Sequence, residues 1–286
     1  MFFGGVFLMN YKIVSDSSSN VFSLSGVDYE AVPLRIITAA AEYVDNAELD
    51  VEKMVNEIRV TKGKSSTSCP NMGDWLDAFE GADVIFGITI TRKLSGSYAA
   101  AVQAAEEYEN SHPGAKVHII DSTSTGPEMR LIMEFLRDRM LEGKSFEEIK
   151  AAVEQYCEHT HLLFSLESLT NLARNGRVNP AVAKIAGVLG IRVVGAATEG
   201  VLDPLHKCRG EAKALDTLYK EMKLRGYGGG KVGISHCFNL NAANTVKEKI
   251  LADYPDASVV IEPTTALCSF YAERGGILIG FEDATV

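Results

Sequence analysis

Residues Ala82–Tyr108 read ADVIFGITITRKLSGSYAAAVQAAEEY, and this stretch decides the fold. Val84–Ile90 is apolar and rich in β-branched residues, which predicts a strand buried on both faces. A polar loop, Arg92–Ser97, comes next, and it is followed by an alanine-rich segment whose apolar residues recur at helical spacing. A buried strand that passes through a short polar loop into a helix is the repeating unit of a parallel α/β sheet.

The loop between this strand and this helix has the features of an anion-binding site. The first N–H groups of a helix have no partner within the helix, and the helix dipole favours negative charge there. Ser95 and Ser97 can donate hydrogen bonds, and Gly96 lets a ligand approach the backbone. Capping of the helix by Ser97 explains the same pattern equally well. The loop is therefore either an anion site or a helix cap.

Similar units recur through the first half of the chain. Apolar strand segments alternate with amphipathic helical segments, which predicts a parallel, doubly wound sheet. Ser145 and Glu148 form a capping box that opens the last of these helices. The expected strands are Lys12–Val14, Val84–Ile90 and Lys116–Ile120, and the expected helices are Ala47–Val60, Asn71–Glu80, Ala99–Tyr108, Pro127–Glu142 and Ser145–Cys157.

The second half combines helices with a sheet of mixed strand direction. A Glu199–Gly200 turn joins Ile191–Ala196 to Val201–Gly210, which predicts an antiparallel hairpin. We place a domain boundary before His159, so that residues 1–158 and 159–286 form two α/β domains. The other expected helices are Leu166–Ala173, Ala181–Leu189, Glu211–Leu224 and Leu240–Ala252, and the other expected strands are Val232–His236, Ala257–Glu262 and Gly276–Phe281.

Several loops of the first half are rich in serine and threonine. In parallel sheets, ligands bind outside the carboxyl ends of the strands. Loops that converge on that edge would line a pocket with neutral donors, which suit a small anionic or hydroxylated head group. Asp16 and Asp121 lie in these loops and are either acid/base groups or formers of Asx turns. The loops are Ser15–Ser19, Ser65–Pro70, Arg92–Ser97 and Asp121–Gly126.

Composition limits the possible partners and the compartment. The chain has 286 residues and a formal net charge of −10, which argues against a nucleic-acid partner and against stable docking on an anionic membrane. Transient membrane contact through a local basic patch stays open. Its five cysteines form no CxxC motif, which indicates free thiols in a reducing cytoplasm. Residues 1–8 are apolar but too short to span a bilayer, and Met9 is an alternative start.

The familiar catalytic signatures are absent from the sequence. It contains no GxGxxG, Walker, HExxH or GxSxG motif, which argues against the common nucleotide-binding, zinc-protease and hydrolase classes. Ser95 as a nucleophile would need a base and an orienting carboxylate, and no histidine has an obvious claim to that role. Cys157, His159 and His161 are a conceivable metal cluster without a fourth ligand nearby.

Basic residues gather in turns of the second half, around Gly176 and Gly210. In an acidic protein, arginines in loops favour bidentate contact with a phosphate or with the carboxylates of a partner. Pairing with neighbouring acids such as Glu211 accounts for the pattern equally well. The residues are Arg174, Arg177, Lys207 and Arg209.

Several motifs occur in a fixed order: SDSSS (15–19), TSCP (67–70), ITITRKLSGSY (88–98), IIDSTS (119–124), LARNGRV (172–178) and LHKCRG (205–210). Together they resemble the DegV family of bacterial fatty-acid-binding proteins, from about Tyr11 to Phe281. The resemblance implies a two-domain α/β carrier that buries one long-chain fatty acid, such as palmitate, between its domains. It implies no catalytic residue, metal or cofactor, and it implies a separate fatty acid kinase as the partner that forms the acyl phosphate.

The resemblance also implies roles for individual residues. Thr67 and Ser95 match the hydroxyls that bind the fatty acid carboxylate, and Ser68 and Gly96 stand beside them in the same motifs. Tyr271 stands roughly where many relatives carry a histidine that helps to hold the head group. A tyrosine hydroxyl donates a hydrogen bond but does not titrate near neutral pH.

Two basic residues match positions that face the kinase or the transferred phosphate in the family, Arg177 and Arg209. Two enzyme classes remain as alternatives to the carrier. One is a small-molecule phosphotransferase related to dihydroxyacetone kinases, and the other is an acyl hydrolase that uses Ser95.

Overall fold

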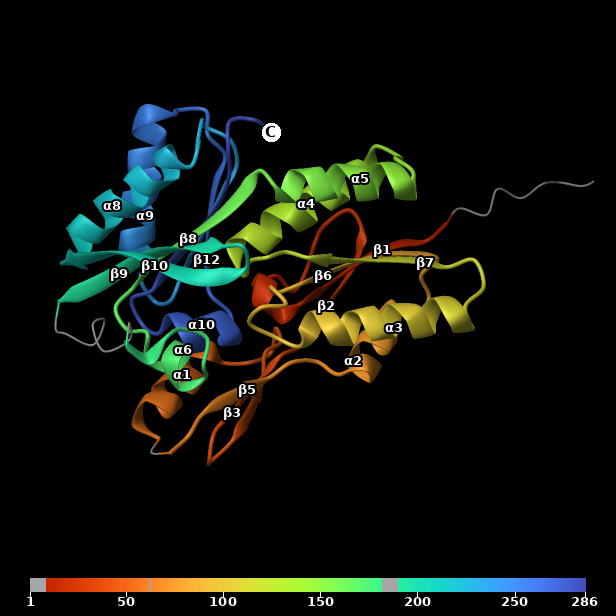
Figure 1. The fold of residues 1–286 in the computed structure, drawn as a ribbon, viewed down its shortest axis with the longest axis horizontal. Helices are drawn as coiled ribbons and strands as arrows, with labels where there is room; N and C mark the ends of the chain where they lie inside the picture. The colour runs from red at the N-terminus through yellow and green to blue at the C-terminus, as the bar shows by residue number, and fades with distance from the viewer. Residues whose placement is uncertain (1–8, 62, 182–189) are drawn as a thin grey trace, which may run out of the picture.

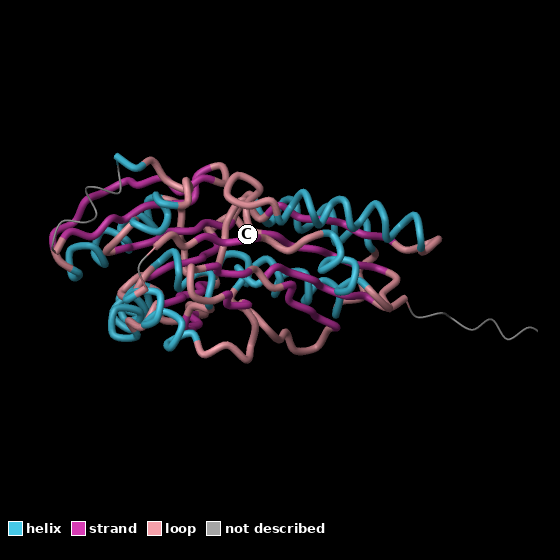
Figure 2. Tube along the Cα trace, turned by 90° about the horizontal axis from the view of Figure 1, so that it is seen from below, coloured by secondary structure: helices cyan, strands magenta, loops and turns pink. Residues whose placement is uncertain are grey.

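The computed structural model describes residues 9–61, 63–181 and 190–286, which form two larger sheets, a small third sheet and the helices around them (Figure 1). In the view turned by 90°, the strands of the parallel sheet run roughly along the long axis of the molecule (Figure 2). None of the helices in these ranges is both long and apolar enough to cross a membrane. The apolar run at residues 1–8 lies outside the described residues.

The first half forms a parallel sheet in the strand order β2–β1–β6–β7. Every residue of β6 is buried, as the apolar Val84–Ile90 segment predicts. The doubly wound parallel sheet is confirmed, and β2 is a strand that the sequence analysis did not include. The strands are β1 (Tyr11–Asp16), β2 (Asp28–Val32), β6 (Val84–Thr89) and β7 (Lys116–Asp121).

Helices cover both faces of this sheet. Ile85 packs in one cluster with Trp75 and Phe79, whereas its neighbour Phe86 packs with Ile132 and Ile149 on the opposite face. Successive side chains of a strand point to opposite faces, so a strand covered on both sides must be apolar throughout. The helices are α2 (Met72–Phe79) and α3 (Ser97–Ser111) on one face and α4 (Pro127–Leu141) and α5 (Phe146–Cys157) on the other.

Side-chain caps fix where several helices begin. The capping box expected at Ser145 is present, since its side chain accepts from the Glu148 N–H while the Glu148 carboxylate accepts from the Ser145 N–H. Asp50 caps α1 (Val51–Val60) by accepting from Lys53 N at 2.9 Å. The helix expected from Ala47 therefore starts at Val51.

A small antiparallel sheet lies beside the first sheet, in the order β4–β3–β5. Its strands are β3 (Arg35–Ile37), β4 (Glu42–Val44) and β5 (Ser66–Ser68). The expectation that Ser65–Pro70 is only a loop was wrong, because Thr67 pairs with Ile36. Strands this short are fixed by pairing with distant partners rather than by their own sequence.

The second half forms a mixed sheet in the order β10–β9–β8–β13–β11–β12, in which only β11 and β12 are parallel. The expected mixed sheet and the hairpin of β9 and β10 are confirmed. The strands are β8 (Thr160–Leu166), β9 (Ile191–Thr198), β10 (Val201–Arg209), β11 (Val232–His236), β12 (Val259–Pro263) and β13 (Ile277–Glu282).

One expected helix of the second half needs correction, and another helix was not predicted. The helix expected at Leu166–Ala173 begins later, because β8 continues to Leu166 and α6 occupies Thr170–Arg174. Helix α10 (Ala266–Ala272) was not expected at all. The helix expected at Ala181–Leu189 lies outside the described residues, apart from its first residue.

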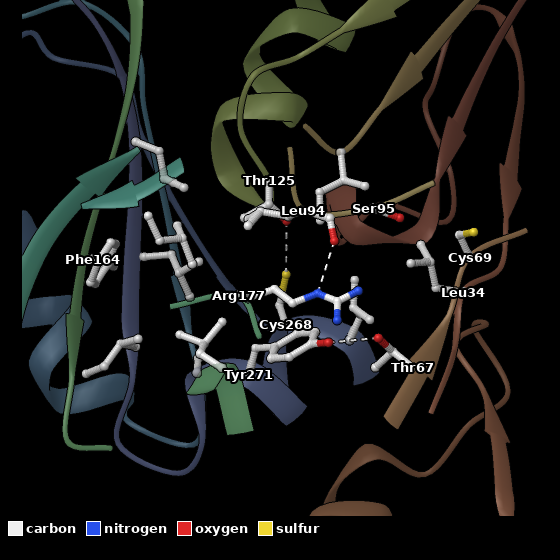
Figure 3. Close-up of a pocket in the computed structure, with 18 of the residues that line it drawn as sticks. Leu34, Thr67, Cys69, Leu94, Ser95, Thr125, Phe164, Arg177, Cys268 and Tyr271 are labelled. Atoms are coloured by element: carbon white, nitrogen blue, oxygen red, sulfur yellow. Dashed lines mark hydrogen bonds between the residues drawn. The ribbon is translucent and has the colours of Figure 1, made fainter. Parts of the chain in front are cut away.

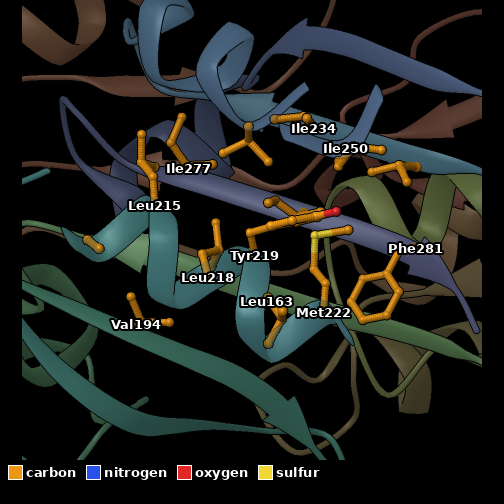
Figure 4. Packing of buried hydrophobic residues seen from close by; sticks show 14 of the residues in the cluster. Leu163, Val194, Leu215, Leu218, Tyr219, Met222, Ile234, Ile250, Ile277 and Phe281 are labelled. Carbon is orange, nitrogen blue, oxygen red and sulfur yellow. The ribbon is translucent and has the colours of Figure 1, made fainter. Parts of the chain in front are cut away.

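The two faces of the second sheet have different neighbours. One face packs under α8 (Glu211–Leu224) and α9 (Leu240–Asp253), with Leu163, Val194 and Ile277 in a closed core (Figure 4). The other face presents Phe164 and Leu278 toward α6 and α10. This second face points toward the first half of the chain, and the candidate site lies there.

Helix α4 joins the two larger sheets. A Cβ added at Gly280 of β13 would lie 2.6 Å from Cα of Glu128 and 2.6 Å from the carbonyl carbon of Pro127. A Cβ at Gly233 of β11 would lie 3.1 Å from Cβ of Pro127. The first turn of α4 therefore rests directly on the backbone of the second sheet. The domain boundary before His159 stays a prediction.

Glu128 at this junction leads to a prediction on stability. Its carboxyl is buried and is bonded by Ser124 Oγ and by Thr160 Oγ1, the latter at 2.9 Å, and burial raises its pKa from 4.5 to about 7. The folded state therefore binds this proton more tightly than the unfolded state, so stability falls as pH rises from 4.5 to 7.

The variant Glu128→Gln is expected to be more stable than the wild type above pH 7, by up to about 3 kcal/mol. The reason is that burial raises the pKa of Glu128 from 4.5 to about 7, and one pKa unit corresponds to about 1.4 kcal/mol. The difference should shrink toward zero as pH falls to 4.5. Urea unfolding across this pH range measures it. A difference that does not change with pH would contradict the assignment.

Candidate functional site

A cavity of about 250 Å³ lies where the two larger sheets meet. Its wall combines the loops that follow β5, β6 and β7 with the open face of the second sheet and with α6 and α10. Most of the lining side chains are apolar, so the cavity suits a hydrocarbon. The lining residues are Leu34, Thr67, Ser68, Cys69, Ile90, Leu94, Ser95, Gly96, Thr125, Leu162, Phe164, Leu166, Leu172, Arg177, Leu202, Leu267, Cys268, Tyr271, Ala272 and Leu278.

Hydroxyl groups gather at one end of the cavity. Thr67 Oγ1 and the Tyr271 hydroxyl are 2.7 Å apart and share a hydrogen bond, although they are 204 residues apart in the chain. Burial raises the pKa of Tyr271, so its hydroxyl stays protonated and available as a donor. Figure 3 shows this pair on one side of the Arg177 guanidinium and Leu94–Ser95 on the other.

Arg177 supplies the positive charge of the site. Its Nε donates to Leu94 O at 3.1 Å and its Nη1 donates to Asn175 O, which fixes the direction of the guanidinium. Of the described residues that line the cavity, Arg177 alone carries a formal charge. A cation with spare N–H groups in a mostly apolar cavity is a site for one anionic group.

Ser95 lines the cavity from the loop before α3. Ser95 Oγ accepts from Ser97 N at 3.2 Å, so the Ser95 hydroxyl hydrogen is still available for a ligand. The alternative that the Ser97 side chain caps the helix is not supported, because Ser97 Oγ donates to Asp16 Oδ2 at 2.6 Å and no side chain of the described residues caps α3. Of the two serines, Ser95 is the one placed to meet an anion.

The loop Ser15–Ser19 does not line this cavity. Its residues are buried, and Asp16 at its start accepts from Ile90 N, Ser97 Oγ and the backbone N–H of Ser18. Burial raises the pKa of Asp16, and these hydrogen bonds oppose that rise. The predicted pocket lining was therefore wrong for this loop. Asp16 is a structural Asx residue that fixes the start of α3.

A family model described as "Uncharacterised protein, DegV family" matches residues 10–283. This chain belongs to the DegV family. A DegV domain-containing protein of Streptococcus pneumoniae is 40% identical over 279 residues, which are 96% of this chain and 99% of that protein. The resemblance seen in the sequence motifs is confirmed.

Solved structures of similar proteins contain fatty acids. A DegV family protein from Eubacterium eligens loaded with heptadecanoic acid superposes with a TM-score of 0.94 at 43% identity, over 96% of this chain and 99% of that one. The Streptococcus pneumoniae Fatty Acid Kinase (Fak) B3 protein loaded with linoleic acid has a TM-score of 0.94 at 40% identity, with the same coverage.

In this DegV protein, all five expected head-group residues meet in one place. Thr67, Ser68, Ser95, Gly96 and Tyr271 all line the cavity. A Cβ added at Gly96 would lie 3.2 Å from Cys69 Sγ, so this glycine permits close contact between the two head-group loops.

The two expected partner-facing arginines lie in different environments. Arg177 lines the cavity, whereas Arg209 is exposed at the end of the edge strand β10 and is not among the lining residues. The sequence did not predict how the Arg177 guanidinium is oriented, because the orientation depends on a hydrogen bond to Leu94 O, which is 83 residues away in the chain. No local signal in the sequence marks that contact.

The structure does not support a metal cluster at His159 and His161 or a hydrolase site at Ser95. His159 Nδ1 and His161 Nε2 each lie 3.3 Å from Asp283 Oδ2, and no group of three possible ligands among the described residues could hold a metal ion. The described residues that line the cavity include no histidine and no carboxylate. Ser95 therefore has no general base beside it in the cavity, which argues against the hydrolase alternative.

Proposed function

We propose that this protein binds one long-chain fatty acid in the cavity between its sheets, with the carboxylate at Arg177, Ser95 and Thr67 and the tail along the leucine-lined wall. The observation that carries the proposal is the arrangement of the cavity. The Arg177 guanidinium stands at one end with the hydroxyls of Thr67, Ser95 and Tyr271, and most of the other lining side chains are apolar. The fatty acids bound by the Eubacterium eligens and Streptococcus pneumoniae relatives support it.

The energetics agree with such a ligand. Burial of a hydrocarbon chain is favourable by roughly 0.8 kcal/mol per CH₂ group. The tail therefore provides most of the affinity, while the polar end fixes the orientation of the chain. A carboxylate in this cavity needs a charged partner to offset the loss of its hydration, and Arg177 is placed to be that partner.

We further propose that the protein has no catalysis of its own and presents the carboxylate to a separate fatty acid kinase in the cytoplasm. The Streptococcus pneumoniae relative carries the name Fatty Acid Kinase (Fak) B3, which supports a kinase as partner. All five cysteines are free thiols, which agrees with a reducing compartment. Exposed Arg209 is a residue that such a partner would contact. The two halves, 1–158 and 159–286, would each supply one wall of the ligand site.

Mass spectrometry of the purified protein is expected to detect one tightly bound fatty acid of palmitate or oleate size. Ser95→Ala should weaken its binding by about tenfold, because a hydrogen bond to a charged group contributes about 1.5 kcal/mol. Ser111→Ala, at the exposed end of the same helix, is the matched control and should bind as the wild type does. Sugar phosphate or nucleotide bound in place of a fatty acid, or ester hydrolysis lost in Ser95→Ala, would contradict the carrier.

A further inference from the structure

A second cavity, of about 360 Å³, lies next to the first. The same elements form the wall between them. Helix α10 gives Tyr271 to the first cavity and Phe270 to the second, and α6 gives Leu172 to the first and Arg174 to the second. No lining residue is shared, so the second cavity is a separate site.

Basic side chains dominate the charge of this second cavity. Arg59, Lys64, Arg174 and Arg274 line it from α1, the segment before β5, α6 and the residues after α10. No carboxylate of the described residues forms an ion pair with Arg59, Lys64 or Arg174, and only Arg274 has one, through Glu52 at 3.2 Å. Such a gathering is unusual in a protein whose formal net charge is −10.

Two carboxylates, Glu167 and Glu273, also line the cavity and offset part of this charge. Glu273 Oε1 accepts from Ser168 Oγ at 2.8 Å and from Asn171 N at 3.3 Å. Glu167 pairs with Arg192. Glu273 has only neutral hydrogen-bond donors and keeps its negative charge, so the three cations without an ion-pair partner leave about two positive charges uncompensated around the cavity.

We propose that this second cavity binds a phosphate-bearing anion. One carboxylate would compensate only one of these two positive charges, whereas a phosphate carries about −1.5 to −2 at neutral pH and a diphosphate carries more. Arginine side chains bind phosphate oxygens with two parallel hydrogen bonds, and the lysine adds a point charge.

The apolar part of the wall of the second cavity distinguishes a nucleotide from a free phosphate as the ligand. Ile58, Val55 and Phe270 form an apolar side beside the basic one. A nucleotide would use both sides, with its phosphates on the arginines and its base on the apolar side chains, whereas a free phosphate or diphosphate would use only the basic side. Both kinds of ligand bind through a phosphate group.

Isothermal titration with pyrophosphate at low ionic strength tests the site. We expect saturable 1:1 binding that Arg174→Ala and, separately, Lys64→Ala each weaken by at least about tenfold. Lys213→Ala, an exposed lysine on α8, is the control and should bind as the wild type does. ATP provides the second arm. Tighter binding of ATP than of pyrophosphate supports a nucleotide, and equal binding supports the phosphate group alone.

Two results would overturn the proposal: no saturable binding at millimolar pyrophosphate, or an affinity that is unchanged in both variants. The fatty acid content of the same samples, measured by mass spectrometry, reports on the first cavity. It should be unchanged in Arg174→Ala and Lys64→Ala, because neither residue lines that cavity. Failure of the phosphate site is thus distinguished from failure of the fatty acid proposal.

Discussion

Replacing Arg177 with methionine is expected to weaken binding of a long-chain fatty acid by about 100-fold, equivalent to about 2.7 kcal/mol. Methionine keeps an unbranched side chain of similar reach but removes the guanidinium. The carboxylate would then lose the one formal charge among the described residues that line the cavity. Hydrogen bonds from Ser95 and Thr67 would remain, but neutral donors only partly replace a charged partner in a mostly apolar cavity.

Competition between a fluorescent fatty acid and unlabelled palmitate measures this effect in the delipidated protein. Arg177→Lys should recover only part of the affinity, because an ammonium group cannot bond Leu94 O and a carboxylate with the planar geometry of the guanidinium. Arg137→Met, on α4 and bonded to Asp138, is the matched control and should bind as the wild type does. A variant Arg177→Met with wild-type affinity would contradict a carboxylate at this end of the cavity.

The head-group hydroxyls were predictable from the sequence, because a local pattern marks them. Ser95 stands in a polar loop between a buried strand and a helix, and the ends of parallel strands share one edge. Thr67 belongs to a hydroxyl-rich segment whose motif resembles the family. Their hydrogen-bond partners were harder to predict, since the bond between Thr67 and Tyr271 joins residues 204 positions apart.

Helix α10 shows why some elements could not be predicted. Its first N–H groups, from Ala266 and Leu267, donate to Asp45 at 2.8 and 3.1 Å, across 221 and 222 residues of sequence. The cap is therefore supplied by a distant loop, and no neighbouring residue in the sequence indicates where the helix begins. The short strands β3–β5 have the same origin, because pairing with one another defines them. Long apolar strands such as β6, in contrast, can be predicted from their own residues.

Gly280→Val is expected to destabilise the protein by more than about 4 kcal/mol, which exceeds the usual 1–3 kcal/mol of core overpacking. The reason is that the added atoms would meet backbone rather than a flexible side chain. A Cβ at this position already lies 2.6 Å from Glu128 Cα and from the carbonyl carbon of Pro127. The first turn of α4 must then move away from β13.

Thermal unfolding of the purified variant measures the loss, and a fall in Tm of about 10 °C or more is expected for a chain of this size. Gly280→Ala should show a smaller fall in the same direction, because it adds one methyl group instead of three carbon atoms. Fatty acid binding should weaken as well, since α4 connects the parallel sheet to the face that carries Phe164 and Leu278. A wild-type Tm in Gly280→Val would show that α4 does not rest on β13, and the two walls of the cavity would then need another connection.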